Sequence, residues 1–451
     1  MYIKELKEKL GSEKVNVNET VLYRHSQDES PHPASLPDVV CFPIDKEDVK
    51  ETVRIATKYK IPITPYGAGT GLEGQAIPIQ KGIVISFENM NQLVEFSPEN
   101  LTVTVKPGMT RLRLNEIVNR EGLFFPLDPG ADASIGGMVA TNASGTTAVR
   151  YGSMREQVLD LEVVLMDGSI IHTGSQAKKS SSGYHLNGLF VGSEGTLGIV
   201  TEVTLRLHGI PEHTIAARCT FPTIQACVEA AHMILSSGIP VLRMELVDSI
   251  SIRQVNGYGG YDFPVAESIF LEFAGFQSAV EEEVKLAHEL LTDLGCLSWD
   301  VAKDSMERSQ LWKARHEMSY SFRHIKGKKA LGSDVCVPIS RLAELVEYTR
   351  FLAEKEHLLM GILGHMGDGN YHSIIVYDPN NAAEHEAAIK VNEAIVFKAI
   401  ELKGTSTGEH GVGLGKIKFQ EAEHGSAIPV FRALKTLFDP GNLLNPGKIF
   451  T

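Results

Sequence analysis

The chain has 451 residues, of which 43% are hydrophobic and 22% charged, values typical of a globular protein and not of a disordered or fibrous one. Its formal charge is −13, and no basic stripe offsets that charge, so we expect no nucleic-acid partner. The five cysteines include no C-x-x-C pair, which disfavours a disulfide framework and a thiolate metal site and fits a reducing compartment.

The first ten residues, MYIKELKEKL, alternate charged and hydrophobic side chains as a short amphipathic helix does. They have neither the apolar run of a signal peptide nor the composition of a transit peptide. No apolar stretch approaches the ~18 residues that span a bilayer. We therefore expect a cytoplasmic protein without a transmembrane segment.

Residues 1 to about 210 are rich in glycine and in short β-type segments such as PITPYG, GIVISF and LTVTVKPG. Turn signals such as Asp167-Gly168 separate these segments, which predicts hairpins and antiparallel pairing. The hydrophobic pattern predicts one helix at residues 46–60 and another at 111–121.

From about residue 214 to 405, helical segments alternate with strands such as SIFLEFAGF and LLMGILGH. This alternation of helices and strands predicts an α+β domain whose helices pack on one face of a sheet. The predicted helices span residues 223–236, 280–294, 305–325, 341–357 and 384–402. The rest of the chain, residues 405–451, contains one helix near 429–438 and the segment LLNPGKIF.

A glycine-rich loop, GTGLEG at residues 69–74, satisfies the dinucleotide-binding pattern G-x-G-x-x-G. That pattern has meaning only where the glycines open a helix between two strands. Here QAIPIQKGIVISF follows, which contains Pro78 and is too short for a crossover helix, so a nicotinamide site is excluded. The glycines still allow the backbone to approach a ligand and aim amides at phosphate, the alternative being a flexible hairpin turn.

Two further segments have a similar composition. The block PLDPGADASIGGMVATNASG crowds small residues with short hydroxyl and amide side chains, which suits a backbone-lined groove for a large polar cofactor; a plain irregular loop is the alternative. The segment GSEGTLGIVTEVTLRL places glycines at the start of a strand.

A second kind of motif contains histidines. GHMGDGNYH, flanked by LLMGIL and SIIVY, predicts a β-hairpin with its turn at residues 367–370. In that register His365 and His372 face each other with Cβ atoms roughly 5 Å apart, and two such imidazoles can share a zinc or manganese ion or simply pack on a turn. Glu409 and His410, in STGEHG, supply a carboxylate and a third imidazole; two imidazoles and one carboxylate leave coordination positions open for a substrate.

In order and spacing, PYGAGTGLEG, DPGADASIGGMVATNASG and VGSEGTLGIVTEVTLRL resemble the FAD-binding domain of the vanillyl-alcohol-oxidase (PCMH-type) flavoproteins. GHMGDGNYH, STGEHGVGLGK, LLNPGK and LWKARHEMSYS are similar to the D-2-hydroxyacid dehydrogenase branch, closest to the D-lactate dehydrogenase (cytochrome) and glycolate oxidase catalytic-subunit types. The resemblance implies an α+β protein with a two-part FAD-binding domain at 1–213. A substrate or cap domain with an antiparallel sheet and the metal-binding hairpin follows at 214–408, and a segment at 409–451 returns to the FAD domain.

The resemblance also implies the site. FAD is expected to be non-covalent because residues 63–78 contain neither histidine nor cysteine. The implied cofactor contacts are Gly67, Gly69, Thr70, Gly71, Pro129, Ser134, Gly137, Asn142, Gly145 and Ile199. The implied metal ligands are His365, His372 and Glu409, with His410 as general base and Arg315 as the clasp of the substrate carboxylate. Gly332 stands where D-2-hydroxyglutarate dehydrogenases carry a lysine, which argues against a dicarboxylate substrate.

The implied reaction is FAD-dependent oxidation of a D-2-hydroxy acid, D-lactate first and glycolate second, by metal-assisted removal of the hydroxyl proton and hydride transfer to flavin N5. The expected electron acceptor is a quinone, a cytochrome, a flavoprotein or a partner subunit. A homodimer and a place in an oxidase complex both stay open. The alternatives are a glycolate oxidase subunit active only in its complex, a metal-dependent hydrolase, and a non-catalytic flavin-binding subunit.

Overall fold

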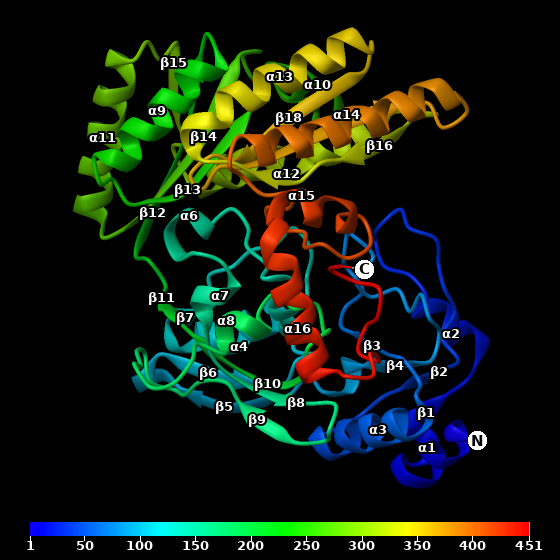
Figure 1. Cartoon of the computed structure of the whole chain (residues 1–451). Coiled ribbons are helices and arrows are strands. Elements are labelled where there is room, and N and C mark those ends of the chain that lie inside the picture. Colours follow the sequence, from blue (N-terminus) through cyan, green and yellow to red (C-terminus); the bar gives the residue numbers. More distant parts are fainter. Residues whose placement is uncertain (451) are drawn as a thin grey trace. The chain divides into compact units, whose positions relative to one another are not determined.

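The computed structural model describes residues 1–450 and divides into two compact units (Figure 1). Unit 1 consists of Met1–Gly145, Tyr151–Ile210 and Glu409–Thr451. Unit 2 consists of Thr146–Arg150 and Pro211–Gly408. The C-terminal segment therefore belongs to the same unit as the N-terminal half, although about 200 residues separate them along the chain.

The first sheet of unit 1 has four strands in the order β1-β2-β4-β3. Its strands are β1 (Val15–Asn16), β2 (Val39–Cys41), β3 (Ile63–Tyr66) and β4 (Ile83–Ser86). The predicted antiparallel pairing of PITPYG with GIVISF is wrong, because β3 and β4 run parallel. The physical reason is burial: every residue of β2 and β4 is buried, and the continuous hydrophobic runs are typical of parallel strands covered on both faces.

The second sheet of unit 1 has five strands in the order β5-β6-β10-β8-β9, and all its pairs are antiparallel. Its strands are β5 (Leu93–Ser97), β6 (Thr102–Val105), β8 (Val158–Val164), β9 (Ile170–His172) and β10 (Ile199–Arg206), and a two-stranded pair joins β7 (Leu123–Phe124) to β11 (His208–Gly209). The predicted hairpin at Asp167-Gly168 is confirmed. Gly168 has φ +82°, and Ser169 N donates to Asp167 Oδ1 over 2.8 Å.

The helices of unit 1 are short except for one. They are α1 (Tyr2–Leu10), α2 (Glu19–Arg24), α3 (Lys46–Tyr59), α4 (Arg111–Val118), α5 (Ile135–Thr141), α7 (Met154–Gln157), α8 (Asn187–Phe190), α15 (Gln420–His424) and α16 (Ile428–Phe438), with α6 (Ala148–Tyr151) at a boundary between the units. The helix predicted at 46–60 is confirmed: Asp45 caps α3 by accepting from Asp48 N, and Val49 and Val53 bury its apolar face. The helix predicted at 111–121 ends earlier, where a 3-10 turn follows α4.

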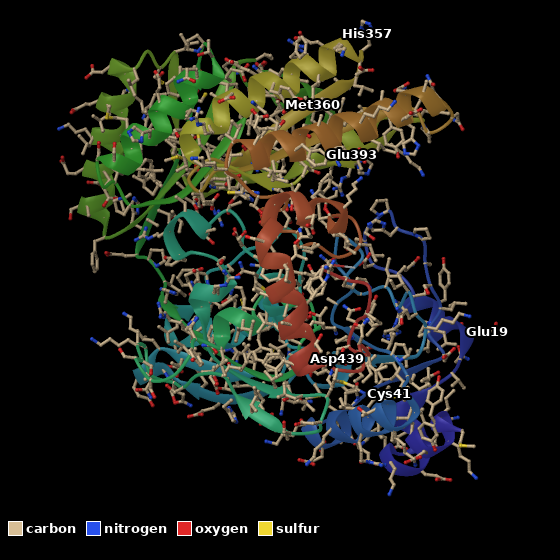
Figure 2. All side chains as sticks on the ribbon, in the orientation of Figure 1. Glu19, Cys41, His357, Met360, Glu393 and Asp439 are labelled. Atoms are coloured by element: carbon tan, nitrogen blue, oxygen red, sulfur yellow. The ribbon has the colours of Figure 1, made fainter. Side chains whose placement is uncertain are left out.

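Helix α16 attaches the C-terminal segment to unit 1 (Figure 1, red). The ring of Phe438 meets Phe190 edge-on with centroids 5.4 Å apart. Lys435 Nζ donates to the carbonyls of Thr196 and Leu444 and pairs with Asp439, which Figure 2 labels at the end of the helix. These buried contacts fix the turn that carries the terminal motif.

Unit 2 is an α+β domain built on one large sheet. Its strands, in the order β15-β12-β14-β13-β18-β19-β16 with β17 paired to β19, are antiparallel. They are β12 (His213–Phe221), β13 (Val241–Val247), β14 (Glu267–Gly275), β15 (Ser298–Val301), β16 (Lys329–Gly332), β17 (Val335–Cys336), β18 (Leu359–His365) and β19 (Asn370–Tyr377). Figure 1 shows the sheet running from β15 beside α11 to β16 beside α14.

Helices cover both faces of this sheet. They are α9 (Ile224–Ser236), α10 (Ser249–Gly259), α11 (Gln277–Asp293), α12 (Ser305–Arg323), α13 (Leu342–Lys355) and α14 (Ala382–Glu401). On β14, Glu272 binds Arg308 of α12, whereas Glu267 binds Arg350 of α13. Because odd and even residues of a strand point to opposite faces, α12 and α13 lie on opposite sides, and the prediction of helices on one face is wrong. Among the described residues, no helix is both long enough and apolar enough to traverse a bilayer.

Candidate active site

The loop after β3 in unit 1 exposes its backbone amides. None of the amides of residues 67–72 donates a hydrogen bond to another group among residues 1–450. Gly69 has φ +74°. A Cβ on Gly67 would collide with Ser134 Oγ, and one on Gly69 would collide with the Tyr66 hydroxyl. The loop therefore offers a row of unsatisfied donors on a backbone that tolerates no side chain at Gly67 or Gly69, which suits an anionic group such as phosphate.

The N-terminus of α5 lies beside this loop. Ser134 caps the helix by accepting from Gly137 N over 3.3 Å, so Gly67, Ser134 and Gly137 lie together. Asn142 ends α5 in the left-handed conformation (φ 52°), and its Oδ1 accepts from Ser153 Oγ and Arg155 N. Asn142 Oδ1 therefore links α5 to the start of α7, and a contact between Asn142 and the cofactor stays a prediction.

The remaining predicted cofactor contacts lie at three kinds of position. Gly145 has φ +137°, and a Cβ there would lie 2.6 Å from Asp128 Oδ1. Thr70 and Pro129 are half-buried in loops, whereas Ile199 is buried at the start of β10. Their contacts with a cofactor stay predictions.

The histidine hairpin of unit 2 has a different register from the predicted one. β18 ends at His365 and β19 begins at Asn370, so the turn occupies 366–369, and His372 pairs with Leu363. The predicted direct pairing of the two histidines is therefore wrong; Gly369, with φ +81°, closes the turn one residue earlier. The register differs by two residues, which keeps both side chains on one face, and their ring centroids are 5.4 Å apart.

Both imidazoles are oriented through Nδ1. His365 Nδ1 lies 2.7 Å from Glu245 Oε1, and His372 Nδ1 lies 3.3 Å from the Ser333 carbonyl and 3.8 Å from Asp334 Oδ1. These partners accept hydrogen bonds from Nδ1–H, so the tautomer that they select has Nε2 as its basic nitrogen. Histidines that bind metal ions are usually held in this way.

Arg315 joins the same arrangement through Glu245. Its Nη2 donates to Glu245 Oε2 over 2.6 Å, and the carboxylate thus bridges the guanidinium and His365. Burial alone would raise the pKa of Glu245, but His365 and Arg315 outweigh it and lower the pKa below its ordinary value. Arg315 is only 8% exposed, and its Nε has no hydrogen-bond partner among the described residues. A buried donor of this kind suits an anionic ligand.

The segment that precedes Glu409 in the chain is held by hydrogen bonds within unit 2. Asp334 accepts from Gly408 N and Thr407 Oγ1 over 3.0 Å each, and from Asn370 Nδ2 over 2.8 Å. A Cβ on Gly408 would lie 2.7 Å from Asp334 Oδ1 and would collide with the Asn370 amide. The residue before Glu409 is therefore fixed, and only glycine fits there.

Glu409 and His410 themselves belong to unit 1. Ser144 Oγ donates to Glu409 Oε2 over 2.9 Å, and Glu409 Oε1 lies 3.9 Å from His410 Nε2. Gln75 Nε2 donates to the His410 carbonyl over 2.7 Å. The structure thus places Glu409, the predicted metal ligand, beside the second glycine-rich block, which contains Ser144, and His410, the predicted base, follows it in the chain.

Several residues of the site were not predicted, among them Glu245, Gln75 and Glu194. Glu245 is the one acidic residue of the strand VLRMELV, and a carboxylate amid a buried apolar run is a signal that sequence reasoning could have used. Glu194 lies inside the third motif, in Gly192-Ser193-Glu194-Gly195, where an acidic residue between glycines is itself a local signal. Gln75 has no such signal.

Comparison with known proteins accounts for this arrangement. Residues 37–174 match the family described as FAD binding domain, and residues 210–449 match FAD linked oxidases, C-terminal domain. The chain belongs to the FAD-linked oxidases. It is therefore an FAD-binding oxidoreductase of the vanillyl-alcohol-oxidase type. FAD binding explains the three glycine-rich motifs, whereas a metal-dependent hydrolase would have no use for them.

The sequence relatives of this FAD-linked oxidase include D-lactate dehydrogenases and a glycolate oxidase subunit. It is 46% identical to a probable mitochondrial D-lactate dehydrogenase of Danio rerio, over 97% of this chain and 89% of that one. It is 40% identical to the mitochondrial D-lactate dehydrogenase [cytochrome] of Arabidopsis thaliana (92% and 74%), and 34% identical to the glycolate oxidase subunit GlcD of Bacillus subtilis (100% and 97%). Among solved structures, a 4-ethylphenol oxidase of Gulosibacter chungangensis shares the fold with a TM-score of 0.81 at 19% identity, covering 100% of this chain and 96% of that one.

Proposed function

We propose that this chain oxidises a small D-2-hydroxy acid, D-lactate in preference to glycolate, to the 2-oxo acid. The observation that carries the proposal is the arrangement Arg315–Glu245–His365 beside His372 within unit 2. It combines a buried carboxylate-binding cation with two imidazoles oriented by acceptors on Nδ1. The names of the relatives, D-lactate dehydrogenase above all, support the same substrate class.

The residues fit FAD. Its pyrophosphate would bind at residues 67–72, where six amides have no acceptor among the described residues, and at the N-terminus of α5. Residues 63–78 contain no histidine or cysteine, which supports non-covalent binding. When bound, FAD supplies the two-electron acceptor of the reaction.

The residues also fit a divalent metal ion, zinc or manganese. His365 and His372 would bind it through Nε2, because Nδ1 of each ring is held by an acceptor. Glu409 would be the third ligand: it follows Gly408, whose amide is held by Asp334, and Asp334 lies 3.8 Å from His372 Nδ1. When bound, such an ion supplies a Lewis acid for the substrate oxygens.

The chain's own residues have distinct tasks in this proposal. Glu245 binds Nη2 of Arg315 and so fixes the guanidinium, and Arg315 binds the substrate carboxylate through the N–H groups that Glu245 does not occupy. His410 accepts the hydroxyl proton at Nε2, and the negative charge of Glu409, 3.9 Å away, stabilises the resulting imidazolium. Loss of this proton from the hydroxyl oxygen, together with loss of a hydride from the α-carbon, for which FAD would be the acceptor when bound, converts the 2-hydroxy acid to the 2-oxo acid.

The end of β16 favours a substrate without a second carboxylate. Gly332 at the end of β16 has no side chain, and the nearest atom to a Cβ built there is the Ser373 carbonyl, 4.0 Å away. The neighbouring Ser333 and Ser373 hydroxyls bond to each other over 2.7 Å. No cation stands at residue 332 to bind a distal carboxylate, which supports lactate or glycolate.

A second candidate is the catalytic subunit of a glycolate oxidase that works only in a complex. The match to GlcD, which extends over 100% of this chain, favours it. The two candidates differ in one property: the isolated chain turns over with D-lactate in the first, and needs partner subunits in the second.

One substrate panel tests the proposal. The purified protein should be yellow, and anaerobic D-lactate should bleach its flavin bands fastest, glycolate more slowly and L-lactate not at all. The same panel should leave the flavin oxidised with D-2-hydroxyglutarate. A yellow protein that no 2-hydroxy acid bleaches would contradict the proposal and favour a non-catalytic flavin-binding subunit.

A further inference from the structure

A buried cluster in unit 1 binds the backbone just after His410. Gln75 and Glu194 are 8% and 4% exposed; Gln75 directly follows the first glycine-rich motif, and Glu194 lies within the third. Gln75 Nε2 donates to the His410 carbonyl over 2.7 Å. Glu194 accepts from Val412 N over 2.6 Å and from Gly413 N over 2.9 Å. We call Gln75 and Glu194 the buried clamp.

The backbone at this point has no freedom to relax. Gly411 has φ +81°, and a Cβ there would lie 2.5 Å from Glu194 Oε1 and 2.7 Å from Gln75 Nε2. Three residues farther on, Leu414 N donates to the Glu73 carbonyl over 2.7 Å. The segment 410–414 is therefore held by consecutive hydrogen bonds, and only glycine fits at residue 411.

The backbone of both clamp residues is itself held by the C-terminal segment. Asn445 Nδ2 donates to the carbonyls of both Gln75 and Glu194, over 3.0 and 2.8 Å. Lys448 Nζ donates to the Ile77 carbonyl over 2.7 Å and to Asn445 Oδ1 over 3.3 Å. These bonds engage backbone carbonyls of the clamp, so they persist when its side chains are altered.

The dipeptide Glu409–His410 thus lies between two anchors along the chain. Asp334 holds Gly408 on one side, and the clamp holds residues 410–413 on the other. We propose that Gln75 and Glu194 are positioning residues that fix His410 for proton transfer and couple its position to the two FAD-binding loops from which they come. This inference rests on the proposed role of His410 and extends it to residues that touch neither substrate nor metal.

Burial of Glu194 with backbone donors would also be expected of a residue that only stabilises the fold. The two roles differ in what a substitution changes. A purely structural carboxylate affects unfolding and FAD retention, whereas a positioning residue affects the proton-transfer step of a protein that is folded and loaded with FAD. Misplacement of a reacting group by about 1 Å costs on the order of 100-fold in rate.

The test compares Glu194→Gln with Glu162→Gln in the FAD-loaded protein. Glu162 is a matched control, since it is a buried carboxylate of the same unit whose partners, Thr201, Lys46 and His172, lie outside the clamp. Glutamine at 194 retains one acceptor oxygen and leaves one of the two backbone amides unsatisfied. We expect Glu194→Gln to retain FAD and to speed hydrogen exchange of the Val412 and Gly413 amides by about tenfold or more.

The kinetic expectation is specific to proton transfer. Anaerobic flavin reduction by D-lactate should slow by about 10- to 100-fold in Glu194→Gln, with a larger solvent isotope effect and an unchanged half-saturating substrate concentration. Glu162→Gln should match the wild type in all three. Unchanged reduction in Glu194→Gln with faster amide exchange would overturn the inference and leave the clamp a structural feature.

A second variant keeps the inference testable if Glu194→Gln does not fold. Gln75→Met removes the donor to the His410 carbonyl but leaves Glu194 intact, and it should slow reduction with the same isotope signature; a rate equal to that of the wild type would overturn the inference. Reduction of the wild type tests the proposed function separately. If no 2-hydroxy acid reduces the wild type, the proposed function fails, whereas failure of the clamp appears only as a variant that equals a functioning wild type.

Discussion

Glu245 and His365 are direct cross-strand partners on β13 and β18, and the Glu245 carboxylate accepts from His365 Nδ1 over 2.7 Å. The other oxygen of the same carboxylate binds Arg315. One fully buried anion therefore sets the orientation of both a proposed metal ligand and the proposed substrate-binding cation. The predictions below begin with this residue.

Glu245→Gln should weaken metal binding by about 10- to 100-fold, because an amide orients His365 less firmly and does not compensate its charge or that of Arg315. Metal content after dialysis against a chelator series measures this. Glu272→Gln is the matched control: Glu272 is an equally buried carboxylate of β14 that binds Arg308, Arg243 and Trp312 but no histidine. Equal metal content in both variants would contradict the role of Glu245.

Gly408→Ala should displace the chain next to Glu409, since the added methyl group would collide with the Asn370 amide and crowd Asp334. We expect normal FAD content, lowered metal content, and flavin reduction slowed by at least about tenfold. Gly257→Ala, in the same unit and with no atom within 4 Å of the added Cβ, controls for the substitution. Wild-type metal content and reduction rate in Gly408→Ala would show that Asp334 does not fix this segment.

Gly67→Ala should weaken FAD binding by about tenfold or more, equivalent to about 1.4 kcal/mol, because its methyl group would push Ser134 from the cap of α5. Fluorescence titration of the apoprotein with FAD gives the dissociation constant. Gly209→Ala, which has no neighbouring atom within 4 Å, should bind FAD as the wild type does. An unaffected dissociation constant for Gly67→Ala would place the pyrophosphate elsewhere.

Glu194 should make the stability of the FAD-loaded protein depend on pH. Burial raises the pKa of this carboxyl from 4.5 to about 7, so its contribution is fully present below pH 4.5 and is lost as the pH rises through 7. Relative to Glu194→Gln, which does not titrate, the wild type should lose roughly 3 kcal/mol of unfolding free energy between pH 4.5 and 8. Denaturant unfolding at several pH values measures the difference, and parallel curves would rule out a raised pKa.

Much of the fold was predictable because it rests on local patterns. The helix at 46–60 has an N-cap, an apolar stripe and a following strand, and the Asp167-Gly168 turn has a residue that tolerates φ +82°. The parallel pairing of β3 with β4 was not predictable, because it depends on burial from both faces rather than on a turn. The face that each helix of unit 2 covers is likewise a tertiary property.

The site divides in the same way. His365 and His372 stand in one hairpin, so their proximity follows from the sequence even though the turn lies one residue earlier than predicted. Glu245 is 120 residues from His365 along the chain, and the clamp residue Gln75 is 335 residues from His410. Such partners become neighbours only through the order of strands in the sheet and through the return of the C-terminal segment to unit 1. No local sequence pattern encodes either.

The most direct test of the account is anaerobic flavin reduction by D-lactate in the wild type and in His410→Ala, followed by stopped-flow absorbance. The account predicts that both proteins bind FAD and metal equally and that reduction in His410→Ala is slower by at least about 100-fold. Reduction of the variant at the wild-type rate would contradict His410 as the proton acceptor.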